Sequence, residues 1–112
     1  PDAVVVEGPM AGGHLGFKED QIGDPDFALE KILSDTVAEI KRYEDKWRRT
    51  IPVIAAGGIC TGSDIYNFFK LGARAIQLGT RFVATHECDA DIWFKEPYVS
   101  CRKDDIEIIK SP

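Results

Sequence analysis

The sequence is poor in cysteine, histidine and basic residues, and each shortage excludes a class of protein. The three cysteines are odd in number and form no CxxC pair, which argues against a disulfide framework and favours a reducing, cytoplasmic setting. Lys and Arg number 14 against 19 Asp and Glu, for a net charge of −5. This balance argues against nucleic acid or an anionic membrane as a partner, because both bind basic surfaces. No apolar run is long enough to span a membrane.

Potential metal ligands are equally sparse. His86-Glu87-Cys88 holds two of them, but a structural zinc site needs four and no second closely spaced Cys or His pair follows. We therefore expect a polar surface loop there and no metal site. Cys60 and Cys101 have no base nearby in the sequence, and we interpret both as packing or bystander residues.

What the chain does contain is a repeated unit of strand, glycine loop and helix. Apolar runs predict buried strands at residues 2–7, 51–56 and 75–78, each followed by glycine. Strands that alternate with helices imply a parallel sheet, either a doubly wound open sheet or a (β/α)8 barrel. A complete barrel takes ~250 residues. We therefore expect residues 1–112 to be one partial domain, a piece of a longer protein with about three of the eight units.

The helices carry recognisable start and stop signals. Asp24-Pro25 predicts the beginning of a helix, with Asp as the N-cap, and its apolar stripe runs from Leu29 to Trp47. Thr61 predicts a capping box that begins a second helix, and Gly72 predicts its end.

Beyond the third strand the pattern is less regular. A short helix is expected at 81–84. Over 89–103 we expect two short helices or one kinked helix, because Pro97 interrupts the helical pattern. A short strand or extended segment is expected at 106–109. The aromatic residues of this part are interpreted as core rather than as a stacking platform; they are Trp93, Phe94 and Tyr98.

The loop after the first strand is the most informative segment. Residues 8–16, GPMAGGHLG, hold four glycines and a single histidine, His14. Glycine lets the backbone take positive φ and approach a ligand, and imidazole titrates near neutral pH. His14 is thus the candidate catalytic base, and the alternative is a histidine that is simply hydrogen-bonded in a loop.

Two further strand-to-glycine junctions predict a phosphate site. Gly57-Gly58 and Gly79-Thr80 follow consecutive strands, and (β/α)8 barrels often bind phosphate at that edge through backbone N–H groups. The alternative is a pair of ordinary tight turns. The spacing does not match a dinucleotide fingerprint, because residues 8–16 do not read G-x-G-x-x-G into a helix. Arg81 follows the junction and would contact either phosphate or an acidic neighbour.

Three segments together resemble the nitronate monooxygenase family. They are EGPMAGGHLG at 7–16, IPVIAAGGI at 51–59 and QLGTRF at 77–82, in the family's order and covering essentially the whole chain. The resemblance implies an FMN-binding (β/α)8 barrel, of which this chain would be strands six to eight.

The same resemblance implies roles for residues at the three strand ends. His14 would be the catalytic histidine near the flavin ring, and Glu7 stands where many members have Gln. The residues implied to bind FMN are Glu7, Gly12, Gly13, Gly57, Gly58, Gln77, Leu78, Gly79 and Thr80.

The implied reaction is the oxidation of an alkyl nitronate by O2 to a carbonyl compound and nitrite. His14 would hydrogen-bond the nitronate or remove the α-proton of a neutral nitroalkane. Besides these small molecules and O2, the expected partners include at most a second copy of the chain. Two alternatives stay open: a flavin-dependent enoyl-acyl-carrier-protein reductase, which shares the fold and the loop but uses NAD(P)H, and an inactive truncated barrel.

Overall fold

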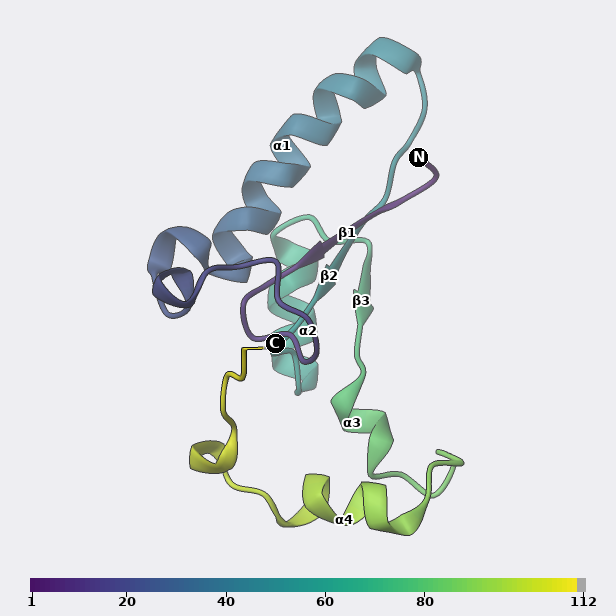
Figure 1. Cartoon of the computed structure of the whole chain (residues 1–112). Helices are drawn as coiled ribbons and strands as arrows, with labels where there is room; N and C mark the ends of the chain where they lie inside the picture. The colour runs from purple at the N-terminus through teal and green to yellow at the C-terminus, as the bar shows by residue number, and fades with distance from the viewer. Residues whose placement is uncertain (111–112) are drawn as a thin grey trace. The chain divides into compact units, whose positions relative to one another are not determined.

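The computed structural model describes residues 1–110 and divides into two compact units. The first runs from Pro1 to Leu78 and the second begins at Gly79. The first contains a sheet and two α-helices, and the described part of the second contains helices and no strand (Figure 1). No helix in the described part of the chain is both long enough and apolar enough to cross a membrane.

A three-stranded parallel sheet forms the centre of the first unit. Its strands are β1 (Val4–Glu7), β2 (Val53–Ala56) and β3 (Ala75–Gln77), in the order β1-β2-β3. The predicted α/β class with parallel strands is therefore confirmed. Each strand is shorter than the apolar run that predicted it: β1 and β2 begin later, next to the bond from Val4 N to Pro52 O, and β3 ends one residue before Leu78.

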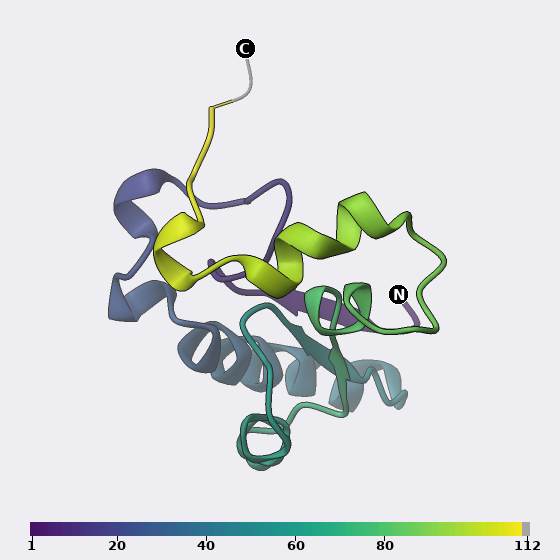
Figure 2. The same cartoon turned by 90° about the horizontal axis from the view of Figure 1, so that it is seen from below.

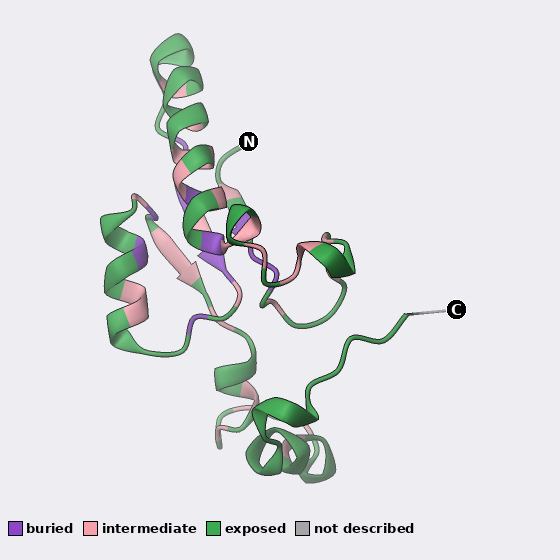
Figure 3. Cartoon of the chain, turned by 90° about the vertical axis from the view of Figure 1, so that its left-hand side faces the viewer, coloured by how far each residue is buried: buried purple, intermediate pink, exposed green. Residues whose placement is uncertain are grey.

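Both α-helices of the first unit cover one face of this sheet. In Figure 2, α1 (Leu29–Trp47) and α2 (Gly62–Lys70) lie on the same side of the strands. Period-2 alternation directs every second strand residue toward them. Figure 3 shows the buried residues gathered on these elements, and the core is formed by Val6, Leu29, Leu33, Val53, Ala55, Ile59, Phe68 and Ala73.

The first helix begins later than predicted. Asp24 caps a 3-10 turn at Pro25–Phe27, with its carboxylate accepting from Asp26 N at 2.9 Å. Ala28 then has extended ψ of 141°, so the α-helix starts only at Leu29. The apolar stripe is buried over its first half, whereas Tyr43 and Trp47 are exposed. Another 3-10 turn, Glu19–Gln21, lies in the preceding loop.

The predicted signals at the ends of α2 are confirmed. The Thr61 hydroxyl accepts from Asp64 N at 3.1 Å, and Asp64 accepts in return from Thr61 N at 2.7 Å. Gly72 follows the helix at φ +104°, the left-handed conformation that ends many helices. A methyl group on Gly72 would lie 3.0 Å from Val37 of α1, so this glycine also allows the end of α2 to approach α1.

The second unit has no buried residue among its described residues. It contains α3 (Thr80–Val83), α4 (Ile92–Ser100) and a 3-10 turn at Lys103–Asp105. The interpretation of its aromatic residues as core was wrong, because Trp93 is 78% exposed and Phe94 is 54% exposed. Phe94 and Tyr98 instead stack on each other at 5.3 Å on the surface of α4. A segment this short cannot enclose large side chains within itself.

Pro97 does not break the last helix. It lies inside α4, which continues to Ser100, so the alternative of two separate helices was wrong. Residues 106–110 form no strand, and Ile109 in that stretch is 85% exposed.

Core packing gives a first prediction. Leu33 is fully buried at the contact between α1 and the sheet, so Leu33→Ala should lower the free energy of unfolding of the full-length protein by about 2–5 kcal/mol. Urea unfolding measures the loss, and Lys41→Ala on the exposed surface of the same helix is the control. Equal stability of the two variants would contradict this core.

Candidate functional site

The carboxyl ends of the three strands form one edge of the sheet. The register aligns Glu7 with Ala56 and Ala56 with Gln77. Because Val6 and Ala55 point into the helix-covered core, alternation places this row on the opposite face. Glu7 and Gln77 are exposed. The structure thus brings two of the predicted cofactor-binding side chains to one face, with a small alanine between them.

Gly57 and Gly58 follow β2 in a conformation that other residues avoid. Their φ angles are +97° and +70°, which glycine adopts at no steric cost. Within residues 1–110 neither backbone N–H has a hydrogen-bond acceptor. Two neighbouring free amides at a strand end are the donors that an anion such as phosphate requires, so these residues fit the predicted role.

The loop after β1 is anchored at its start and exposed at its tip. Gly8 N donates to Ala56 O at 3.0 Å, and Ala11 N donates back to Gly8 O at 3.1 Å. Gly8 and Pro9 are buried, whereas Gly12, Gly13 and His14 are exposed. The predicted catalytic histidine therefore stands on an exposed loop whose base is fixed to the tip of β2.

His14 has no hydrogen-bond or ion-pair partner among the described residues. This arrangement differs from the alternative of a histidine satisfied within its own loop. An imidazole without an internal partner is free to bind a ligand, so the role of His14 as a proton-handling group stays a prediction that the geometry allows.

The remaining predicted residues lie at the junction of the two units. Leu78 ends the first unit, and it packs partly against the core. Gly79 precedes α3, and Thr80 is the first residue of that helix. A methyl group on Gly79 would meet no atom within 4 Å, so its backbone is open to a ligand. The pairing of Gly79-Thr80 with Gly57-Gly58 stays a prediction.

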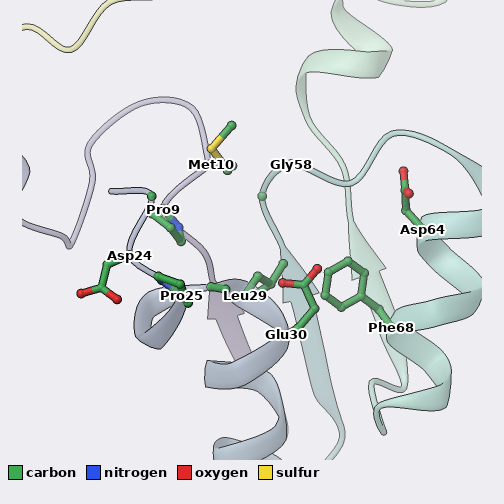
Figure 4. Close-up of a pocket in the computed structure, with 12 residues that line it drawn as sticks. Pro9, Met10, Asp24, Pro25, Leu29, Glu30, Gly58, Asp64 and Phe68 are labelled. Atoms are coloured by element: carbon green, nitrogen blue, oxygen red, sulfur yellow. The ribbon is translucent and has the colours of Figure 1, made fainter. Parts of the chain in front are cut away.

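A pocket of about 260 Å³ opens between the beginnings of α1 and α2. Figure 4 shows Met10 and Gly58 in the upper part of the view, with Leu29 and Phe68 below them. The pocket was not predicted from the sequence. Its charged lining consists entirely of carboxylates, from Asp24, Glu30 and Asp64. Such a lining repels phosphate, so the flavin phosphate is not expected inside this pocket.

Asp64 connects this pocket to the start of α2. The N–H of Thr61 donates to its carboxylate, and this bond lowers its pKa most, with smaller contributions from the Thr61 hydroxyl and the Cys60 amide. Cys60 itself is exposed, which excludes packing and leaves the other half of its interpretation, a bystander residue. Its Sγ lies 3.9 Å from Gly58 O.

Other clusters contribute little to a site. His86 and Glu87 are exposed and Cys88 is half-buried. Within residues 1–110 no three His, Cys, Asp or Glu side chains are grouped so that they could hold a metal ion. In the second unit, Lys95 donates to the carbonyls of Thr85 and Cys88, which fixes the turn between α3 and α4.

Comparison with known proteins identifies a family for this chain. The family model described as nitronate monooxygenase matches residues 1–112. A nitronate monooxygenase of Pseudomonas aeruginosa is 39% identical over 98 residues, which are 85% of this chain and 24% of the relative. A probable nitronate monooxygenase of Staphylococcus aureus is 31% identical over 98% of this chain and 29% of its own length. The chain thus spans about a quarter of these relatives.

Solved structures show the same fold. FabK from Thermotoga maritima is 36% identical, with a TM-score of 0.66 over 89% of this chain and 26% of that protein. The nitroalkane oxidase from Streptomyces ansochromogenes is also 36% identical, with a TM-score of 0.61 over 85% of this chain and 25% of that protein. The predicted fold class, a part of a (β/α)8 barrel, is confirmed by these neighbours.

The capping carboxylate of α2 gives a pH-dependent prediction. Because the folded state lowers the pKa of Asp64, its charge stabilises the fold above the ordinary value of about 3.9, and this contribution is lost as the pH falls toward the lowered pKa. Asp64→Asn should therefore lower the urea midpoint of the full-length protein at about pH 7, and the difference from wild type should shrink by about pH 3.

Asp45→Asn is the matched control for this charge removal. Asp45 lies exposed on α1, so its variant should follow wild type at both pH values. A gap between wild type and Asp64→Asn that stays constant with pH would show that the ionised carboxylate does not stabilise α2.

Proposed function

The chain belongs to the nitronate monooxygenase family, and on that premise we propose that the full-length protein uses FMN to oxidise alkyl nitronates with O2. Two nitronate ions and one O2 give two carbonyl compounds and two nitrite ions. The observation that carries the proposal is the family match over all 112 residues, which includes a histidine loop at a strand end.

The free amides after β2 support FMN as the cofactor. Gly57 and Gly58 have unpaired N–H groups and no side chains, and the open backbone at Gly79 and Thr80 follows the next strand. Such groups bind phosphate without any lysine, which suits a chain with an acid excess. Bound FMN would supply the electron acceptor for the nitronate and the means of reacting with O2.

Two exposed polar side chains at the strand ends support the same assignment. Glu7 and Gln77 present a carboxylate and an amide on the helix-free face, where they would contact the polar edge of the flavin. Gly12 and Gly13 would let the loop backbone approach the ring. Met10 and Ala11 form the part of the loop that lies against Gly57 and Gly58.

His14 would act on the substrate. Its free imidazole could donate a hydrogen bond to a nitronate oxygen, which favours binding of the anion, or accept the α-proton of a neutral nitroalkane. Only the second role requires the neutral ring. Comparing nitronate with its parent nitroalkane as substrate separates the two roles, because the nitronate has already lost its α-proton.

We propose further that these residues belong to one partial barrel domain of a cytoplasmic enzyme, which is the setting predicted from the cysteines. The enoyl-acyl-carrier-protein reductase stays the alternative enzyme. The two activities have different products, so one preparation tests both: nitrite released from a nitronate, and NAD(P)H consumed with an enoyl thioester. A protein consisting of residues 1–112 that purifies without absorbance near 450 nm would favour the inactive, truncated alternative.

The catalytic role of His14 gives the next prediction. In the full-length protein, His14→Ala should retain FMN absorbance but lower nitrite release about 10²–10⁴-fold, the contribution expected of a general acid or base. His86→Ala removes the other histidine of the segment, which lies in the second unit, and should keep wild-type turnover. Wild-type turnover in His14→Ala would refute the assignment.

A further inference from the structure

Gly57 and Gly58 are closely covered by the loop that carries His14. A methyl group on Gly57 would lie 2.9 Å from Ala11 N and 3.0 Å from Ala11 Cβ. A methyl group on Gly58 would lie 2.8 Å from Met10 Cβ, the contact visible at the top of Figure 4. These separations are shorter than packed carbon atoms accept, so any side chain at either position would displace the loop.

Among the other glycines with positive φ, only Gly72 also has a close neighbour, and that neighbour is Val37 of α1 rather than the histidine loop. Gly13 and Gly23 also have positive φ, both +90°, but a methyl group on either would meet nothing within 4 Å. Gly12 and Gly16 have open space as well. Backbone conformation alone therefore does not explain the Gly57-Gly58 pair, whereas contact with the neighbouring loop does.

The covered part of the loop is also the part that is fixed. Gly8 N continues the ladder to Ala56 O, and Ala11 N closes a turn onto Gly8 O. A methyl group on Gly8 would lie 2.8 Å from Leu29 Cβ, so the loop is held between the start of α1 and the tip of β2. His14 follows Ala11 by three residues, and a displacement at Met10 or Ala11 would move its imidazole.

We infer that Gly57 and Gly58 are positioning residues for His14, in addition to any contact that their amides make with a phosphate. Because neither glycine has a side chain, Ala11 can lie against Gly57 and Met10 can lie against Gly58. This inference rests on the proposed function for its effect on turnover. The structural part of the inference, that the position of the loop depends on the glycine pair, does not rest on the proposed function.

The test is a set of variants of the full-length protein in which one steric contact is created and then removed. Gly58→Ala creates the contact with Met10 Cβ. Adding Met10→Gly removes that carbon, whereas adding Met10→Ala keeps it. Gly23→Ala is the matched control, because it has a similar positive φ without a neighbouring atom. Met10→Gly alone reports the effect of the second substitution.

The first measurement is hydrogen exchange of the peptide spanning residues 8–16, which requires no activity. Gly58→Ala should speed its exchange, Met10→Gly in the same chain should restore protection, and Met10→Ala should not. Gly23→Ala should leave this peptide unchanged. Unchanged exchange in Gly58→Ala would overturn the inference. Faster exchange that Met10→Gly fails to reverse would also overturn it, because conformational strain would then be the cause.

The second measurement is nitrite release with flavin content determined alongside. Gly58→Ala should lower kcat by up to ~10²-fold, as expected for a displaced catalytic group, with FMN retained and turnover recovered in the Met10→Gly double variant. Loss of FMN that the double variant does not recover would assign Gly58 to phosphate binding alone. If wild type releases no nitrite, the proposed function fails, and the exchange result still decides the positioning role.

Discussion

The parallel alignment of three short strands is the constraint on which the rest of the structure depends. Only because β1, β2 and β3 run in the same direction do their glycine-rich continuations emerge at one edge. In an antiparallel sheet the histidine loop and the Gly57-Gly58 pair would leave from opposite edges. The helices stabilise this arrangement, because Leu29 and Leu33 of α1 and Phe68 of α2 pack on the same face of the sheet. The carboxyl ends of the strands continue into the loops.

The elements that the sequence predicted well are those specified by local interactions. The capping box at Thr61 and the left-handed helix end at Gly72 involve residues a few positions apart, so the linear sequence shows their spacing directly. The start of α1 was predicted too early because Asp24 caps a 3-10 turn, which ends at the extended Ala28. No nearby residue type indicates that the turn does not continue into the α-helix. The aromatic residues of α4 were misjudged because hydrophobicity does not reveal whether a partner surface exists.

The same distinction between local and long-range interactions applies to the candidate site. Residues with a chemical or conformational signature, such as His14 and the glycines, were recognised from type and spacing. The contact of Met10 and Ala11 with the glycine pair after β2 was not predicted, because it spans more than forty residues and exists only once the strands pair. The acidic pocket was missed for the same reason: Asp24, Glu30 and Asp64 come from three separate segments. The three carboxylates disfavour anions inside this pocket.

The order of the sheet has a practical consequence. β1 and β3 are its outer strands in the described structure, and each leaves one row of backbone donors and acceptors unpaired. Unpaired rows of this kind recruit strands from neighbouring molecules, and Val5, half exposed on β1, would add an apolar contact to such pairing. Preparations of residues 1–112 alone should therefore self-associate through the outer strands β1 and β3. Dilution or a fused solubilising partner would be needed to keep them monomeric.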